Sequence, residues 1–242
     1  MMNHSIKWIC FGSAILMMAC NPAKQNTSAL PVKNDMDLQG HRGCRGLMPE
    51  NTIPAMLKAI DLGVTTLEMD VVISKDKQVV VPHDVFFHQN ITTTPAGKTL
   101  TKKEAVDHLL FTMNYDSIRK YDVGLKQHPD FQQQQKMAVH KQLLKDLVMA
   151  TEKYAAEKNN PVNYNIEIKS KLANDGTKHP PIEEFVDLAI AVIRSAGIAD
   201  RTTVQSFDPR ALQVVHRKYP GMITSLLMEG SDRRGLDVQL EQ

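Results

Sequence analysis

The sequence predicts an α/β fold built on a parallel sheet, and three observations lead to this class. Short apolar runs alternate with amphipathic helical segments along most of the chain. The runs are mostly apolar, as is typical of parallel strands covered by helices. Polar residues gather where the first four runs end, which is where the active site of a (β/α)8 barrel lies. A doubly wound sheet is the alternative, but its Gly-x-Gly-x-x-Gly phosphate turn is absent from the sequence.

Length and composition restrict the function further. The chain has 242 residues, 42% of them apolar, which is enough for one domain with a substantial core. Its formal net charge is +2 and it has no long basic block, so nucleic-acid binding has no electrostatic support. The three cysteines, Cys10, Cys20 and Cys44, do not make a disulfide framework. We interpret Cys44 as a small residue in a glycine-rich loop.

Residues 1–20 have the pattern of a signal peptide. Lys7 precedes an apolar core over residues 8–19, which is shorter than the roughly 20 residues that span a bilayer. The end of this segment, residues 16–20, resembles a bacterial lipoprotein cleavage box, and an ordinary secretory signal is the alternative. We therefore predict an exported protein, periplasmic or at the cell surface, anchored to a bacterial membrane by lipidated Cys20.

The predicted domain spans residues 37–242 and follows a polar, flexible tether over residues 21–36. Its first strand, residues 38–41, runs into a glycine-rich loop. A helix follows, with Asn51 or Thr52 as its N-cap, Pro54 in its first turn and Gly63 at its end.

Two acidic residues stand out in the next strand, which we predict over residues 65–72. Glu68 and Asp70 are two positions apart, so they share one face of the strand. Two carboxylates inside an apolar strand repel each other and are costly to bury, and a divalent cation between them relieves both effects. The third strand, residues 79–83, ends at His83.

An irregular insertion with short helical pieces is predicted over residues 85–140, because polar residues are frequent there and the apolar periodicity is weak. The remaining elements are predicted as a helix over 141–157, a strand over 163–169, a helix over 182–196, a strand over 202–207, a helix over 210–219 and a strand over 222–228. Six strands are two fewer than an eight-stranded barrel needs. We therefore expect a chain that is incomplete at its C-terminus and lacks the last two strands.

Six short motifs then occur together in one order. They are His41-Arg42-Gly43, Pro49-Glu50-Asn51-Thr52, Glu68-x-Asp70, His83-Asp84, Glu167-x-Lys169 and Gln205-Ser206-Phe207-Asp208. Together they resemble the glycerophosphodiester phosphodiesterase family over residues 38–228. The resemblance implies a TIM barrel with an insertion after the third strand. It also implies hydrolysis of a small-molecule glycerophosphodiester to glycerol 3-phosphate and an alcohol.

Three acids on two strands are the candidate metal ligands. Glu68, Asp70 and Glu167 offer hard oxygen atoms, which favour one divalent cation, Mg²⁺ or Ca²⁺. Such a cation neutralises and orients an anionic phosphodiester. The alternative is that these acids only form salt bridges with nearby basic residues, namely Arg42, Arg45 and Lys169.

His41 and His83 suit general acid and base catalysis, because imidazole titrates near neutral pH. The resemblance implies that one histidine deprotonates a glycerol hydroxyl, which attacks phosphorus, while the other protonates the leaving alcohol. It also implies that water then opens the resulting cyclic phosphate. Both assignments of these two roles remain open. Arg42 and Lys169 are candidate phosphate ligands, and Glu50 contacts the metal or the glycerol or else caps its helix. We interpret the other histidines that follow the signal segment as surface or loop residues, namely His88, His108, His128, His140, His179 and His216.

Two other functions are kept as alternatives. A related phospholipase would cleave an intact lipid or a phosphoinositide with the same groups. A truncated, non-catalytic lipoprotein would only bind phosphorylated ligands. No oligomeric state is predicted.

Overall fold

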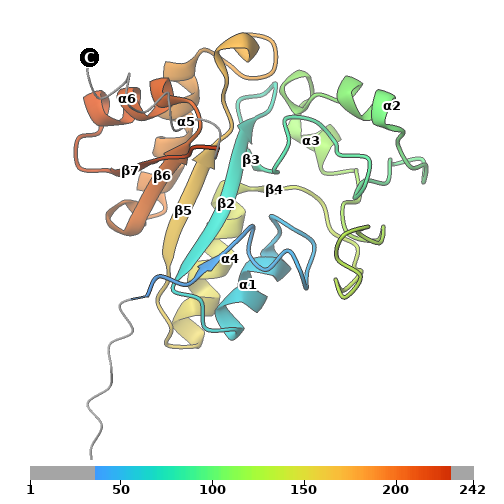
Figure 1. Cartoon of the computed structure of the whole chain (residues 1–242), viewed down its shortest axis with the longest axis horizontal. Helices are drawn as coiled ribbons and strands as arrows, with labels where there is room; N and C mark the ends of the chain where they lie inside the picture. The colour runs from blue at the N-terminus through green and yellow to red at the C-terminus, as the bar shows by residue number, and fades with distance from the viewer. Residues whose placement is uncertain (1–35, 230–242) are drawn as a thin grey trace, which may run out of the picture. The chain divides into compact units, whose positions relative to one another are not determined.

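The computed structural model describes residues 36–229 of the chain (Figure 1). The predicted signal peptide, the lipidation site at Cys20 and nearly all of the predicted tether lie outside the described residues. None of the described helices is long and apolar enough to cross a membrane.

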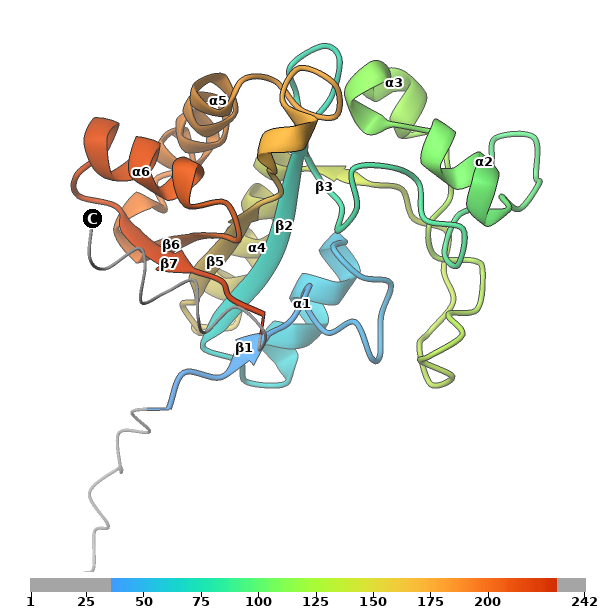
Figure 2. The same ribbon diagram turned by 45° about the horizontal axis from the view of Figure 1, so that its top comes forward.

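Five parallel strands form the main part of a seven-stranded sheet (Figures 1 and 2). In spatial order they are β1 (Gln39–Gly40), β2 (Thr66–Ile73), β5 (Asn163–Ile168), β6 (Thr202–Ser206) and β7 (Ile223–Leu226). In the described part of the chain, β1 and β7 are the two edges of this parallel section. The α/β class and the parallel sheet are therefore as predicted.

The third predicted strand was expected to be parallel to its neighbours, but it is antiparallel to them. β3 (Val79–Val81) is antiparallel to β2, and β4 (Gln142–Leu143) is antiparallel to β3. A tight turn explains this correction, because Lys77 has a positive φ of 59° and its N–H donates to the carbonyl of Ser74. A turn this short can only join antiparallel strands, since a parallel connection needs a crossover of a dozen or more residues.

Six α-helices and three short 3-10 helices complete the described fold. They are α1 (Ile53–Asp61), α2 (Lys102–Asp107), η1 (Leu110–Thr112), α3 (Tyr115–Ile118), α4 (Leu144–Glu157), η2 (Leu172–Asn174), α5 (Ile182–Ser195), η3 (Ala199–Arg201) and α6 (Pro209–Lys218). Thr52 is the N-cap of α1 and accepts a hydrogen bond from the N–H of Ala55, with Pro54 in the first turn. Of the two predicted caps, Thr52 is the correct one.

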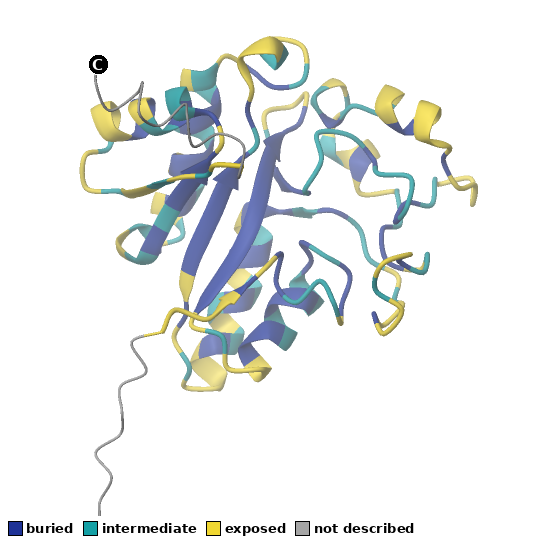
Figure 3. Cartoon of the chain, in the orientation of Figure 1, coloured by how far each residue is buried: buried dark blue, intermediate teal, exposed yellow. Residues whose placement is uncertain are grey.

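The two faces of β2 have different tasks. Leu67, Met69 and Val71 belong to a core shared with α1, α4, α5 and α6, whereas Glu68 and Asp70 point to the opposite face. Figure 3 shows β2 as buried along its length. The polar face is therefore the one on which a functional site is built.

The insertion over residues 85–140 has its own small core. Phe87, Leu110 and Ile118 pack there against Val72 of β2 and Val80 of β3. The segment contains α2, η1 and α3 as short pieces between irregular stretches, as predicted. His128 lies in an irregular stretch of this segment, so its interpretation as a surface or loop residue holds for the loop, although the residue is only 6% exposed. His179 also lies outside the helices and strands and is fully buried.

Candidate active site

The loop between β1 and α1 is fixed by its backbone. Arg42 and Gly43 have positive φ angles of 52° and 81°. A Cβ on Gly43 would lie 2.7 Å from the carbonyl carbon of Ala55, so only glycine lets the loop pack this closely on α1. The Arg42 N–H donates to Glu68 Oε2 at 2.7 Å, which ties the loop to β2. Burial raises the pKa of the Cys44 thiol in this loop to about 11, as for an unreactive structural cysteine.

The three predicted metal ligands come together on adjacent strands. Asp70 of β2 and Glu167 of β5 are direct partners in the parallel register, and Glu68 precedes Asp70 on the same face. One carboxylate oxygen of each residue lies within 4.8 Å of the other two, and all three residues are buried. We call Glu68, Asp70 and Glu167 the acidic triad.

The charges of the acidic triad fit a cation. Burial and the neighbouring charge of Asp70 raise the pKa of Glu68 to about 8, although the N–H of Arg42 opposes the shift. Burial raises the pKa of Glu167 as well, against the effect of Lys169. A bound divalent cation would stabilise the ionised forms of Glu68 and Glu167, and the all-oxygen donor set suits Mg²⁺ or Ca²⁺.

Basic residues also contact the acidic triad. Lys169 Nζ lies 2.9 Å from Glu167 Oε1 and 3.3 Å from Asp70 Oδ1, and Arg42 Nε lies 3.7 Å from Asp70 Oδ2. The salt-bridge alternative is therefore partly realised for Lys169 and Arg42. Arg45 differs from this expectation, because its ion pair is with Glu50 at 3.7 Å.

Glu50 holds the side chain of Arg42. Both of its carboxylate oxygens accept from Arg42 Nη1, at 3.1 and 2.9 Å. Glu50 does not cap α1, whose N-cap is Thr52, so the capping interpretation is wrong. The contact orients a guanidinium beside the acidic triad.

His41 and His83 line one pocket of about 360 Å³ together with the acidic triad. His41 Nε2 lies 4.0 Å from Glu68 Oε2. Burial, with Arg42 and Arg45 nearby, lowers the pKa of His41, which favours the neutral imidazole that can accept a proton. His83 Nδ1 lies 3.1 Å from Asp84 Oδ1, which orients the ring.

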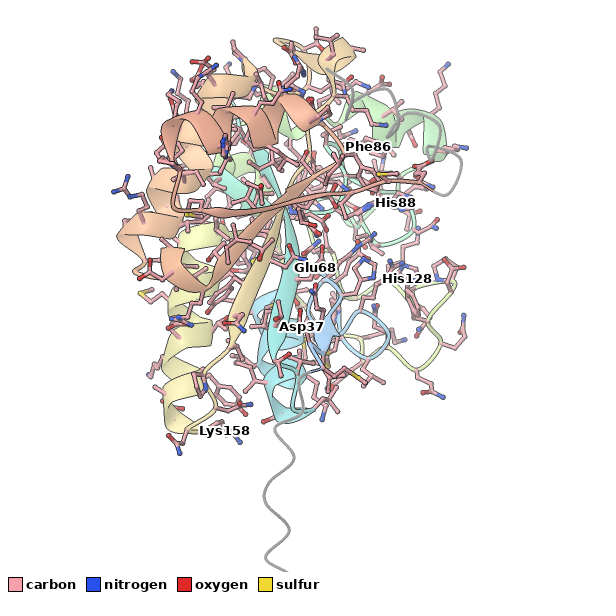
Figure 4. The ribbon with its side chains drawn as sticks, turned by 60° about the vertical axis from the view of Figure 1, so that its left-hand side comes forward. Asp37, Glu68, Phe86, His88, His128 and Lys158 are labelled. Carbon is pink, nitrogen blue, oxygen red and sulfur yellow. The ribbon has the colours of Figure 1, made fainter. Side chains whose placement is uncertain are left out.

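A second, larger pocket of about 690 Å³ adjoins the first one. The two pockets share five lining residues, namely His83, Glu167, Lys169, Phe207 and Leu227. Figure 4 labels Glu68 on β2, and Phe86 and His88 on the insertion. Phe86 lines the larger pocket, so the insertion contributes to the wall of the site.

Amide side chains to which the sequence analysis gave no role at the site support the acidic triad. Gln205 Nε2 donates to Glu68 Oε1 at 3.2 Å, and Asn165 Nδ2 donates to Gln205 Oε1 at 3.1 Å. Asn51 Nδ2 donates to Asp70 Oδ2 at 2.8 Å. Asn165 was detectable in principle, because it precedes Glu167 by two positions and therefore shares its face.

A buried lysine was also missed. Lys141 is 5% exposed, and its Nζ lies 5.3 Å from the ring centre of Phe87. Burial lowers the pKa of its amine to about 8, although Glu50 and Asp84 favour the charged form. It immediately precedes β4, where the local pattern carries no sign of burial.

Comparison with known proteins now decides the family. The family model "Glycerophosphoryl diester phosphodiesterase family" matches residues 41–240. The chain belongs to this family. A glycerophosphodiester phosphodiesterase from Caldanaerobacter subterraneus subsp. tengcongensis is 28% identical over 191 residues, which are 78% of this chain and 65% of that protein. A glycerophosphodiester phosphodiesterase from Bacillus subtilis is 26% identical over 209 residues, 84% of this chain and 63% of that protein. The chain thus spans less than two thirds of these relatives.

Solved structures of the family share the fold. A protein from Silicibacter pomeroyi, described as a candidate glycerophosphoryl diester phosphodiesterase, is 30% identical with a TM-score of 0.70, covering 82% of this chain and 68% of that one. An Oleispira antarctica phosphodiesterase solved with its product sn-glycerol-3-phosphate is 19% identical with a TM-score of 0.63, covering 85% of this chain and 71% of that one. These likenesses confirm the predicted fold class for this member of the glycerophosphoryl diester phosphodiesterase family.

Proposed function

We propose that the protein hydrolyses glycerophosphodiesters to glycerol 3-phosphate and an alcohol. The observation that carries this proposal is the shared pocket, in which His41 and His83 face a space bounded by the acidic triad. Proton transfer at two oxygens and neutralisation of one phosphate charge are the requirements of phosphodiester cleavage. Family membership supports the same reaction.

The chain's own residues divide the chemistry as follows. Neutral His41 or His83 removes a proton from the attacking glycerol hydroxyl, and the other histidine, when protonated, gives a proton to the leaving alkoxide. Water then opens the resulting cyclic phosphate, which gives glycerol 3-phosphate. Arg42 and Lys169 carry positive charge beside the pocket and stabilise the phosphate oxygens. Asp84 holds the ring of His83 in one orientation through its contact with Nδ1.

A divalent cation, Mg²⁺ or Ca²⁺, is proposed as the cofactor, with Glu68, Asp70 and Glu167 as its ligands. When bound, it would supply Lewis-acid stabilisation of negative charge on the phosphate. The amides of Asn51 and Gln205 hold Asp70 and Glu68 by hydrogen bonds, so the ligand oxygens keep their orientation.

Product analysis tests the reaction. The protein is incubated with glycerophosphocholine, with phosphatidylcholine vesicles and with phosphatidylinositol vesicles, each with Mg²⁺, Ca²⁺ or EDTA. Release of glycerol 3-phosphate and choline from glycerophosphocholine alone is expected. Cleavage of the vesicle lipids would favour the phospholipase alternative. Binding of glycerol 3-phosphate without any turnover would favour the non-catalytic alternative.

We also propose that the protein is exported and anchored through Cys20, as the first 20 residues indicate. The test is to express the protein in a bacterial host that is supplied with a radioactive fatty acid. The wild-type protein should become labelled. The C20A variant should be unlabelled. Labelling that persists in C20A would contradict the anchor.

A further inference from the structure

The segment over residues 170–181 forms one wall of the larger pocket. It follows β5 and contains η2, and three of its residues line this pocket, namely Ser170, Lys171 and Asn174. Lys169, which contacts the acidic triad, immediately precedes it. The segment therefore stands beside the place where the phosphate of a substrate would lie.

Arg210, at the start of α6, ties this segment to the end of β6. Its Nη1 and Nη2 donate to the two oxygens of Asp175 at 2.9 and 3.0 Å. Its Nε and Nη2 also donate to Asp208 Oδ1 and Oδ2 at 3.0 and 2.6 Å. Ser170 Oγ donates to Asp208 at 3.0 Å, so Arg210 and Asp208 connect the start and the middle of the segment to the end of β6.

A buried histidine fixes the inner side of the same segment. His179 is fully buried, with Nδ1 2.8 Å from the carbonyl of Pro180 and Nε2 3.1 Å from the N–H of Lys171. With the proton on Nδ1, the ring donates to Pro180 and accepts from Lys171. The N–H of Gly176 donates to the carbonyl of His179 at 2.8 Å, so the segment is a closed loop with a defined conformation.

The charges make Arg210 necessary for this conformation. Its hydrogen bonds lower the pKa of Asp175. Burial raises the pKa of Asp208, but the hydrogen bonds from Arg210 and Ser170 outweigh it and keep this pKa below its usual range. Two ionised carboxylates therefore share one guanidinium, and they would repel each other without it.

Arg210 is not needed to hold α6 itself on the sheet. That task falls to Ala211, Val214 and Val215, which are buried in the main core. The side chain of Arg210 is 27% exposed and does not line either pocket of the site. Its contacts thus act on segment 170–181 rather than on the core.

We propose that Arg210 is a positioning residue, which through Asp175 and Asp208 sets segment 170–181 as the wall that recognises the alcohol part of the substrate. This proposal rests on the proposed function. It predicts that loss of the Arg210 side chain changes the KM for a glycerophosphodiester with a given alcohol group. The reacting groups at the acidic triad should stay in place.

The test compares R210M with R217M. Arg217 lies on the same helix and pairs with Glu183 on the exposed surface, so R217M is a matched loss of one salt bridge. With glycerophosphocholine as substrate, R210M should raise KM about tenfold with kcat within about twofold, and R217M should leave both unchanged. Affinity for Mg²⁺ or Ca²⁺, measured by titration calorimetry, should be the same in all three proteins.

Amide hydrogen exchange gives a second readout that needs no turnover. In R210M the amides of residues 171–179 should exchange at least tenfold faster, while those of β2 and β5 keep their protection. Adding D175N to R210M should lower the raised KM part of the way toward the wild-type value, because it removes the repulsion between the two carboxylates.

Three outcomes would overturn the proposal. They are an unchanged KM in R210M, an unchanged exchange of residues 171–179, or a joint loss of kcat, metal affinity and protection of β2. If the wild-type protein hydrolyses no glycerophosphodiester, both the proposed function and the role of segment 170–181 in substrate recognition are wrong. Faster exchange of residues 171–179 in R210M would then still show that Arg210 holds segment 170–181 in place.

Discussion

The ammonium group of Lys169 lies 2.9 Å from a carboxylate oxygen of Glu167. Glu167 is on β5, and Lys169 directly follows the last residue of this strand. Lys169 also reaches Asp70 at 3.3 Å. The lysine therefore contacts two of the three proposed cation ligands. A divalent cation and this ammonium group compete for the same oxygen atoms.

Replacement of Lys169 by Met should strengthen metal binding and weaken catalysis. The neutral side chain removes a positive charge from beside the acidic triad, so affinity for Ca²⁺ or Mg²⁺ should rise about tenfold, or about 1.4 kcal/mol. Turnover should fall because the phosphate loses a cationic contact. Titration calorimetry and a glycerophosphocholine assay measure the two effects. Lys145, exposed on α4, provides the control K145M. Unchanged or weaker metal affinity in K169M would argue against competition.

The double variant E68Q/D70N should lose metal binding. Two of the three carboxylates become neutral amides of similar shape, so divalent-cation affinity should drop by about a hundredfold or more, and activity with it. In the wild type the melting temperature should rise on adding the cation, and in the double variant this shift should vanish. D187N, which removes a half-buried carboxylate on α5 outside both pockets of the site, should behave like the wild type. A retained metal-dependent shift in E68Q/D70N would refute the site.

The variants H41A and H83A should each lower kcat by about 10²- to 10⁴-fold, since each removes one proton-transfer group. Their metal affinity should stay within about twofold of the wild type, because the acidic triad is unchanged. H216A provides the control, because His216 is exposed on α6. Near-normal turnover in H41A or H83A would remove that histidine from the mechanism.

Lys141→Met should stabilise the protein at pH 7. The pKa of the buried amine falls from 10.5 to about 8, which corresponds to a penalty of about 3 kcal/mol for its charged form. Between pH 8 and 10.5 the unfolded chain binds more protons at this residue than the folded chain does. Wild-type stability should therefore rise with pH in that window relative to K141M.

Urea unfolding of both proteins at pH 7 and pH 10 measures this difference, with K153M on α4 as an exposed control. The advantage of K141M over the wild type should shrink at the higher pH. A less stable K141M at pH 7 would mean that the contact of the lysine with Phe87 outweighs its desolvation.

The sequence allowed the acids to be predicted because their relation is local. Glu68 and Asp70 share a face through the two-residue period of a strand, and no tertiary information is needed to see it. The direct pairing of Asp70 with Glu167 is different, since it depends on the register between two strands far apart in the chain. Family resemblance, not periodicity, brought Glu167 into the predicted site.

Other features depended on packing that the local sequence does not encode. His179 stands among polar and proline residues, yet it is fully buried by the fold of segment 170–181. Gln205 and Asn165 have no charge to mark them, and their role follows only from their contacts with Glu68 and with each other. The direction of β3 was mispredicted because an apolar run looks the same in a parallel and an antiparallel strand.

The pairing of β2 with β5 has a consequence for how the chain folds. Asp70 and Glu167 meet only after the polypeptide between them, including the insertion, has closed into a loop. Each doubling of a flexible loop costs only about 0.6 kcal/mol, so changes of length in the exposed parts of the insertion are compatible with an intact site. Such non-local pairing is also slow to form. The rate at which cation affinity returns during refolding would therefore report the rate at which β2 and β5 pair in their native register.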